Sequence, residues 1–377
     1  MIKAKIYIVL FSLIGLIPLI QLASHVLPDD PLDEKRLPSP EPEWGRRRDL
    51  RTYLLGWQDW FNDRYPGRNF LIRLKTQIDY SLFGFSDRIY MGKDGWLFYR
   101  NVLDDSKPEI DAYSPAQIDA LIGRYRMLNS WLKARGITLV IMDVQLKDEF
   151  YGDKLPSSAP RRPLHPTYFE IRRRLKEDVG AVYVDSTPIL RRIMAKRPVF
   201  FKTDFHWNDP AAFEVARSIV DRLSQIAGRP SAGWKFKLEI ETRVGWGGQA
   251  AFMPLLRPDP ELGLFVKKTW ADEGGAYEFA KEPFESIYRR NQPSEDYLPT
   301  TVLLGDSFSN GMLRCGFCEH FNSLYRIHMN HCSMEESLRS LPSGTQFLIL
   351  EFIETAVGVY RVPVDFDDLS SVKPNGF

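Results

Sequence analysis

The chain has 377 residues, of which 50 are Lys or Arg and 49 are Asp or Glu, and its apolar fraction is 44%. A nearly neutral chain has no long-range field that would select a polyanion, so we expect no nucleic-acid partner. The apolar content is ample for a packed core, which excludes a disordered chain.

Residues 1–28 are typical of a membrane-spanning signal anchor. Lys3 and Lys5 precede an uncharged stretch from Ile6 to Pro28, and acidic residues follow it. The stretch is long enough to cross a bilayer as a helix, and its basic flank predicts that the chain is anchored in the inner membrane with the rest in the periplasm. A cleaved signal peptide is the alternative, although no Ala-x-Ala site ends the run. A buried core helix fits the terminal position and charge asymmetry poorly.

Residues 29–48 are dense in Pro, Asp, Glu and Arg, which predicts a linker between the anchor and a folded domain over residues 49–377. Several aromatic residues then recur at near-helical spacing. They are better explained as core or interface than as a sugar-binding platform: Trp57, Trp60, Phe61, Tyr65 and Phe70.

From Ser114 onward, helix and strand signals alternate in the order that builds a mostly parallel sheet covered on both faces. Ser114 and Gln117 form a capping box ahead of a helix that Gly136 ends. Ser333 and Glu336 form a second capping box. Strands are predicted over residues 137–144, 181–185, 301–304 and 346–352, so the predicted fold class is α/β.

One region departs from this alternation. From Trp234 to Val244, apolar and charged residues alternate, which predicts a half-exposed strand. We therefore expect residues 229–296 to form an insertion with antiparallel pairing. Insertions on such sheets usually shape the site or bind partners.

The three cysteines, Cys315, Cys318 and Cys332, are an odd number in an oxidising compartment. A bridge between Cys315 and Cys318, or between either and Cys332, is open at this point and leaves one thiol over. His320 lies nearby in the sequence, but structural zinc takes four ligands, so no metal site is predicted.

The tripeptide Gly305-Asp306-Ser307 lies where the predicted strand 301–304 ends and a helix begins. A serine at such a turn presents its hydroxyl, and ligands gather at the carboxyl ends of strands in open α/β sheets. The backbone N–H groups of Ser307 and Phe308 are the predicted donors to an oxyanion. Alone, the tripeptide is a weak signal, because it also occurs in many ordinary loops.

A second segment, Asp204-x-His206-Trp207, supplies partners for that serine. Side chains two residues apart in an extended stretch leave the same side, so Asp204 can accept the Nδ1 hydrogen of His206 and leave Nε2 free to take a proton. Trp207 is predicted to wall the site, and Asp209 with Pro210 to begin the next helix. The alternative is that Asp204 is a cap and His206 an ordinary loop histidine.

Four segments together resemble the alginate O-acetyltransferase family of the AlgJ and AlgX type, within the SGNH hydrolase superfamily. They are residues 61–68, residues 92–99, the Asp204-x-His206-Trp207 element and residues 305–308, and the similarity runs from about Leu50 to Glu354. The resemblance implies an SGNH-like α/β/α sandwich with a mostly parallel sheet. It also implies an extracytoplasmic enzyme that moves acetyl groups onto hydroxyls of an exopolysaccharide.

The resemblance further implies that Ser307 forms the acyl-enzyme, that His206 is the general base and acid, and that Asp204 orients the imidazole. In such systems a membrane-bound O-acyltransferase passes the acetyl group outward, so no soluble cofactor is expected in this chain.

Some positions depart from the family pattern. Lys147 is all that remains of a Pro-x-Lys segment, and we expect it at the oxyanion or substrate-binding site. Gly248 stands where relatives carry Gly-Asp-Leu, as a second oxyanion donor. Other polar residues fall near expected substrate-binding positions: Arg290, Asn291, and Glu351 or Glu354. A basic cluster is explained equally well by polymer binding and by a solvated helix face: Arg161, Arg162, Arg172, Arg173 and Arg174.

Two other functions stay open. A carbohydrate esterase would hand the same acyl group to water, and a noncatalytic SGNH-like subunit would hold a polysaccharide export complex together. Retention of Ser307, His206 and Asp204 favours an enzyme, because a scaffold has no need of all three.

Overall fold

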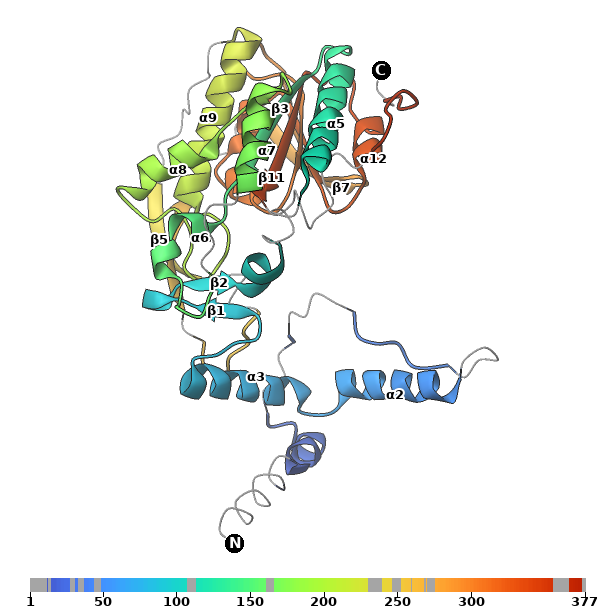
Figure 1. The fold of residues 1–377 in the computed structure, drawn as a ribbon, viewed down its shortest axis with the longest axis vertical. Helices are drawn as coiled ribbons and strands as arrows, with labels where there is room; N and C mark the ends of the chain where they lie inside the picture. Colours follow the sequence, from blue (N-terminus) through green and yellow to red (C-terminus); the bar gives the residue numbers. More distant parts are fainter. Residues whose placement is uncertain are drawn as a thin grey trace.

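The structure is a computed structural model. It describes residues 12, 15–27, 31–32, 37–43, 49–106, 113–160, 166–229, 239–245, 252–258, 260–267, 269, 275–354 and 366–374. Figure 1 shows an α/β body built on one twisted sheet, with α2 (Leu50–Arg64) and α3 (Arg68–Ile78) at the far end of the molecule from that sheet.

The central sheet has seven strands in the order β4-β3-β11-β9-β10-β8-β7. The strands from β4 to β10 are parallel, whereas β8 and β7 are antiparallel at one edge. β9 therefore lies in the middle, between β11 and β10. The bounds are β4 (Val182–Tyr183), β3 (Thr138–Val144), β11 (Phe347–Ile353), β9 (Thr301–Gly305), β10 (Ser323–His328), β8 (Phe284–Arg290) and β7 (Gly275–Lys281).

Helices cover both faces of this sheet. One buried cluster joins the sheet to α5 (Pro115–Lys133), α7 (Pro166–Glu177) and α12 (Met334–Arg339). A second cluster joins the other face to α8 (Ser186–Met194), α9 (Asp209–Ala227) and α11 (Ser309–Arg314). Side chains of β9 alternate between the clusters, as the two-residue period of a strand requires, so the predicted sandwich is confirmed.

The predicted helix starts and buried strands are largely confirmed. Both capping boxes form, Ser114 with Gln117 and Ser333 with Glu336. Strands β3, β9 and β11 match their predicted ranges within one residue. The strand expected over 181–185 is shorter, because Asp185 leaves the sheet and accepts a hydrogen bond from Thr187 N as the N-cap of α8.

Short elements connect the body to the helices α2 and α3. β1 (Ile89–Met91) and β2 (Leu97–Tyr99) form an antiparallel hairpin. The remaining short helices are η1 (Asp79–Phe83), η2 (Lys93–Gly95), η3 (Val102–Ser106), α6 (Lys147–Phe150), η4 (Gly152–Lys154) and η5 (Phe317–His320).

The insertion contains the expected antiparallel pairing, but it divides between two sheets. β5 (Glu239–Gly245) and β6 (Glu261–Lys267) form a separate two-stranded sheet. β7 and β8 instead extend the central sheet at its β10 edge. Residues 230–238, which include the start of the predicted alternating strand, lie outside the described residues.

In the described part of the chain, no helix is both long enough and apolar enough to span a membrane. Residues 1–11, 13–14 and 28 of the predicted anchor lie outside the described residues. So do residues 29–30, 33–36 and 44–48 of the predicted linker.

The three cysteines are free thiols, so none of the three bridges considered above forms. Cys315 and Cys318 are both buried but have different neighbours. The Cys315 thiol donates to the carbonyl of Asp209 at 3.3 Å, and Cys318 contacts the hydroxyl of Tyr277.

Candidate active site

Ser307 lies in the turn between β9 and α11, at the carboxyl edge of the sheet. Gly305 ends β9 where a side chain would not fit, because a Cβ there would lie 2.7 Å from Oε2 of Glu351. The carbonyl of Asp306 accepts hydrogen bonds from Ser309 Oγ at 2.6 Å and from the buried Arg326 at 3.1 Å. These contacts hold the turn from beneath and leave the Ser307 side chain partly exposed.

His206 and Asp204 come from the loop that precedes α9. An isolated antiparallel bridge between Phe200 and Trp207 closes the base of this loop. The N-cap of α9 is Asn208, whose Oδ1 accepts from Ala211 N at 3.1 Å, so the predicted cap at Asp209 is wrong by one residue. Asp209 is instead buried and receives the guanidinium of Arg314 at 2.6 Å, which ties α9 to α11.

The two segments, about a hundred residues apart in sequence, meet in one hydrogen-bonded chain. Nε2 of His206 lies 2.7 Å from Oγ of Ser307, and Nδ1 of the same ring lies 2.7 Å from Oδ1 of Asp204. The rings of Phe205 and Phe308 pack beside the imidazole, with centroids 4.0 and 4.9 Å from it. A serine, an imidazole and a carboxylate in this order can activate a hydroxyl for attack on an acyl carbon.

Two backbone N–H groups in the turn were predicted to donate to an oxyanion, and one of them donates to a side chain of the turn instead. Phe308 N donates to Oδ1 of Asp306 at 2.8 Å, so the prediction that Phe308 serves an oxyanion is wrong in this conformation. Ser307 N donates to no atom among the described residues, and it remains the candidate donor. The other candidate, Gly248, lies outside the described residues.

A buried pair of carboxyl groups lies beneath the turn. Oε2 of Glu351 accepts from Asp306 N at 3.0 Å, and Oδ2 of Asp306 accepts from Ile353 N at 2.8 Å. Burial first, and the neighbouring Asp306 second, raise the pKa of Glu351 well above its ordinary value, and burial raises the pKa of Asp306 as well. Both carboxyl groups accept backbone N–H groups of the turn or of β11, so the pair stabilises the turn rather than supplying a catalytic base.

Lys147 does not reach toward an oxyanion, which corrects its predicted role. The side chain is buried, and its ammonium donates to the carbonyl oxygens of Asp204 at 2.7 Å, Lys202 at 2.9 Å and Phe201 at 3.4 Å. Burial lowers the pKa of Lys147 to about 7, and the charge of Asp204 partly opposes that shift. Lys147 therefore positions the backbone of the loop that carries Asp204.

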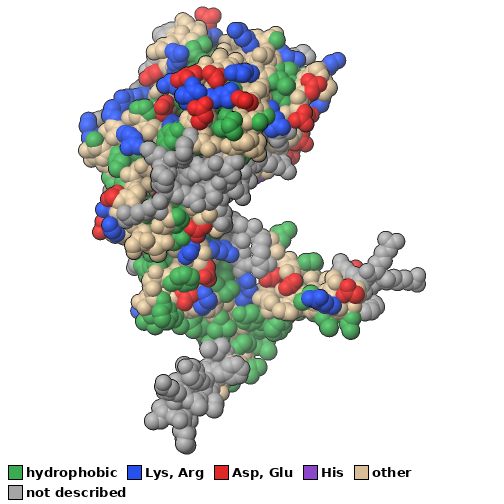
Figure 2. Space-filling view, viewed as in Figure 1, with side chains coloured by type: hydrophobic (Ala, Val, Ile, Leu, Met, Phe, Trp, Pro, Cys, Tyr) green, Lys and Arg blue, Asp and Glu red, His purple; other side chains and the backbone are tan. Residues whose placement is uncertain are grey.

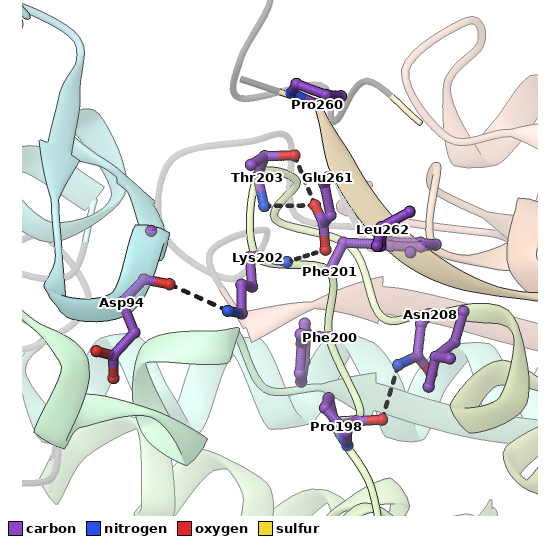
Figure 3. Close-up of a pocket in the computed structure, with 13 residues that line it drawn as sticks. Asp94, Pro198, Phe200, Phe201, Lys202, Thr203, Asn208, Pro260, Glu261 and Leu262 are labelled. Atoms are coloured by element: carbon purple, nitrogen blue, oxygen red, sulfur yellow. Dashed lines mark hydrogen bonds between the residues drawn. The ribbon is translucent and has the colours of Figure 1, made fainter. Parts of the chain in front are cut away.

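A carboxylate holds the same loop from the opposite side. Glu261, the first residue of β6, accepts from Lys202 N at 2.5 Å, Thr203 N at 2.7 Å and the Thr203 hydroxyl at 2.6 Å. Figure 3 shows these contacts at the wall of a hollow of about 360 Å³ between β6 and the back of the loop. Glu261 was not predicted, because its sequence context, an acid after Pro260 in an insertion, carries no signal of the contact.

The remaining predicted binding residues lie away from the serine. Trp207 is completely buried and donates from Nε1 to the carbonyl of Phe308 at 3.0 Å, so it joins the two segments and is no substrate-facing wall. Arg290 is the last residue of β8 and Asn291 follows it, at the amino ends of β9 and β10, whereas Ser307 follows the carboxyl end of β9. Arg290 there lies over the ring of Tyr297 and donates to the carbonyl of Glu319.

The basic cluster on α7 is largely a set of ion pairs. Arg172 contacts the fully buried Asp143 at 2.6 Å and Asp185 at 2.8 Å. Arg173 pairs with Glu170 and Glu177 along the exposed face of the helix. These ion pairs favour a structural role on a solvated helix face over polymer binding. Arg161 and Arg162 lie outside the described residues.

The fold and the site together define an SGNH-hydrolase-like α/β protein, with a serine after a central parallel strand and an Asp-x-His segment beside it. A family model described as "SGNH hydrolase-like domain, acetyltransferase AlgX" matches residues 89–319, which is more than half of the chain. The chain therefore belongs to this AlgX family of acetyltransferases, and the predicted resemblance is confirmed.

Several solved structures are similar to this chain at low sequence identity. The O-acetyltransferase domain of Pseudomonas putida AlgJ is 19% identical over 76% of this chain and 96% of its own, with a TM-score of 0.46. Bacillus cereus PatB1 with a sulfonyl adduct is 13% identical over 74% of this chain and 100% of its own, with a TM-score of 0.52. Pseudomonas aeruginosa AlgX is 18% identical over 76% of this chain and 68% of its own, with a TM-score of 0.43. A sequence search among curated proteins gives no match.

Proposed function

We propose that the protein is an extracytoplasmic O-acetyltransferase that transfers acetyl groups to hydroxyls of an exopolysaccharide through an ester on Ser307. The observation that carries this proposal is the chain of two 2.7 Å contacts from Ser307 Oγ through the imidazole of His206 to Asp204. Membership in a family of acetyltransferases sets the reaction class.

The chain's own residues can perform both halves of such a reaction. Ser307 Oγ attacks the acyl carbon of the donor while Nε2 of His206 takes its proton, and Asp204 stabilises the imidazolium that forms. His206 then returns the proton to the departing donor group, which leaves an acetyl ester on Ser307. In the second half, a sugar hydroxyl gives its proton to His206 and attacks the ester, and Ser307 regains the proton as it leaves.

The partners follow from the same proposal. A membrane-bound O-acyltransferase delivers the acetyl group to the outer side of the inner membrane, where an anchor formed by the amino-terminal apolar run holds this chain in the periplasm. The uncharged stretch from Ile6 to Pro28 and its basic flank support that location.

The first experiment measures release of p-nitrophenol from p-nitrophenyl acetate by the purified full chain. Ser307→Ala is expected to lower the rate by at least about 10³-fold, because the nucleophile is lost. Ser130→Ala, on the exposed side of α5, is the matched control and should keep the parent rate. Equal rates for Ser307→Ala and the parent would refute the nucleophile assignment.

The second experiment separates a transferase from an esterase. Acetyl groups on an added oligosaccharide and free acetate are measured in the same reaction, together with the mass of the trapped acetylated protein. Transfer that exceeds hydrolysis supports the proposal, whereas acetate as the only product would make the protein an esterase.

A further inference from the structure

Exposed apolar side chains are concentrated at one end of the molecule. Among the described residues, fourteen of the twenty large hydrophobic side chains that are exposed lie between Leu16 and Phe85. Figure 2 shows these hydrophobic side chains along the lower end of the molecule, where Figure 1 places α2 and α3. Soluble proteins rarely leave large apolar surfaces open unless the surface has a partner.

The helix α2 has a distinct apolar face. Leu50, Leu54 and Phe61 are 62%, 57% and 58% exposed, and a turn of about 100° per residue places all three within roughly 40° of one another on the helix surface. Tyr53 and Trp57 lie beside them, with ring centroids 6.4 Å apart. No residue of α2 is buried, so this aromatic stripe is not part of the core.

The opposite side of α2 is already covered by the preceding chain. Ser39 N donates to Oδ2 of Asp63 at 2.8 Å, and a Cβ on Gly56 would lie 3.1 Å from Cγ of Pro42. Residues 39–42 therefore occupy the polar side, and the aromatic stripe faces away from the protein.

Two neighbouring segments extend the same apolar surface. At the end of α3 and in η1, the side chains of Ile78, Leu82 and Phe83 are 42%, 73% and 71% exposed. The helical residues 15–24 belong to the uncharged amino-terminal run, and they approach the junction of α2 and α3, where a Cβ on Gly67 would lie 3.1 Å from Cγ2 of Ile17. The apolar run and the aromatic stripe thus emerge at the same place.

The composition of this end favours lipid over protein. Trp, Tyr, Phe and Leu form the stripe, and Arg64 lies over the ring of Trp60 at 5.1 Å. Trp and Tyr are enriched where a bilayer meets water. α3 carries three basic residues, Arg68, Arg73 and Lys75, and no acidic one. Such residues attract anionic headgroups.

We propose that the aromatic stripe of α2, together with η1, lies in the headgroup region of a bilayer that contains anionic lipid. This contact is separate from the amino-terminal anchor and does not depend on the acetyltransferase reaction. The contact holds the α/β body at the membrane surface, with α2 and α3 between the body and the bilayer.

The test uses tryptophan fluorescence of the full chain on vesicles of phosphatidylcholine and phosphatidylglycerol at roughly 70:30, with and without bromine on the acyl chains. Brominated lipid is expected to quench the parent, and the variant Trp57→Phe/Trp60→Phe should lose most of that quenching. The predicted anchor contains no tryptophan, so its insertion cannot produce the same signal.

The second experiment introduces negative charges into the aromatic stripe of α2. Leu54→Glu/Phe61→Glu should abolish the quenching of Trp57 and Trp60, whereas Met127→Glu/Ile226→Glu, at body positions that are each 38% exposed, should leave it unchanged. A vesicle-bound parent whose tryptophans are not quenched would overturn the proposal. A stable dimer in sedimentation that Leu54→Glu converts to a monomer would also overturn it, in favour of a second copy of the chain as the partner.

Discussion

At the scale of single residues, the site depends on the orientation of one imidazole. Asp204 binds His206 twice, through the ring Nδ1 at 2.7 Å and through the backbone N–H at 3.0 Å. The carboxylate therefore fixes both the position of the backbone and the side of the ring that faces Ser307. Phe205 and Phe308 limit rotation of the ring further.

Asp204→Asn tests this dependence. An amide can donate to Nδ1 and so favours the tautomer with hydrogen on Nε2, which cannot take the serine proton. We expect kcat for acetyl-ester cleavage to fall by about 10⁴-fold with the fold intact by circular dichroism. Asp87→Asn, at a side chain that is 70% exposed, serves as the control and should retain parent activity. A loss smaller than tenfold would show that the carboxylate is not needed to set the tautomer.

Lys147→Met tests the buried ammonium through the pH dependence of stability. The pKa of Lys147 is about 7 in the folded protein against an ordinary value of 10.5, so between these values the unfolded chain binds more protons than the folded one. The contribution of this residue to the free energy of unfolding therefore rises with pH across that window.

Urea unfolding of the parent and of Lys147→Met at several pH values between about 6.5 and 9.5 measures this contribution. The parent should gain stability relative to the variant as the pH rises. Parallel curves for the two proteins would mean that Lys147 keeps its ordinary pKa. The variant should also be less active, since three carbonyls near Asp204 lose their donor.

At the scale of elements, the loop before α9 is held between charges of opposite sign. The ammonium of Lys147, next to β3, donates hydrogen bonds to carbonyl oxygens of the loop. The carboxylate of Glu261, on β6, accepts hydrogen bonds from N–H groups of the loop. A loop that carries catalytic groups is precise only when such surrounding contacts fix its backbone. The β5–β6 hairpin is thereby connected to the site although it lies outside the central sheet.

Glu261→Gln tests this connection. The neutral amide keeps the size of the side chain but weakens the three charge-assisted hydrogen bonds that Glu261 accepts, and we expect kcat to fall by about tenfold while KM changes little. Glu239→Gln, on β5, is the matched control, since Glu239 is half exposed and pairs with Lys267 at 3.7 Å. A rise in KM with unchanged kcat would instead place Glu261 in substrate binding.

The elements that could be predicted are those with a local signal. β3, β9 and β11 are uninterrupted apolar runs, and the Ser and Asp-x-His segments have the composition that their chemistry needs. β10 was not predicted, because Arg326 and His328 interrupt its apolar pattern. Arg326 is acceptable there because the carbonyl of Asp306, the hydroxyl of Ser309 and the carboxylate of Glu285 receive it, and that proximity exists only after folding.

The same limit explains the errors at the site. A sequence indicates that Lys147 is near the end of a strand, but not that its side chain turns toward the loop at residues 201–204. Arg290 and Asn291 were predicted to bind substrate from their position in the family pattern. The antiparallel pairing of β8 with β10 places them at the edge of the sheet opposite the one that carries Ser307. The pairing of Asp306 with Glu351 likewise depends on the register of β9 against β11, which no local pattern specifies.

At the scale of the whole molecule, one sheet is buried between two apolar layers of comparable size. Leu128 on α5 belongs to one layer and Leu223 on α9 to the other, and both are completely buried. The sheet separates the two side chains, so they share no contact. The carboxyl-terminal segment is fastened to the first layer by Trp131, whose Nε1 donates to the carbonyl of Leu369 at 3.1 Å.

We expect Leu128→Ala and Leu223→Ala each to lower the free energy of unfolding by about 2 to 5 kcal/mol. Because the sites are separated by the sheet, the double variant should lose the sum to within about 0.5 kcal/mol. Denaturant unfolding measures all three proteins, with Met127→Ala, at a position that is 38% exposed, as the control. A double variant that loses much less than the sum would show that the two layers are coupled.

β6 is fastened at both ends, by Glu261 to the loop before α9 and by the N–H of Val266 to Oδ2 of Asp209 at 3.3 Å. The described part of the stretch that links this strand to β5 is itself packed, because Met253 and Leu255 are buried in one cluster with Ile89 of β1 and Leu97 of β2. A substitution in this stretch therefore disturbs the β1–β2 hairpin as well as β6.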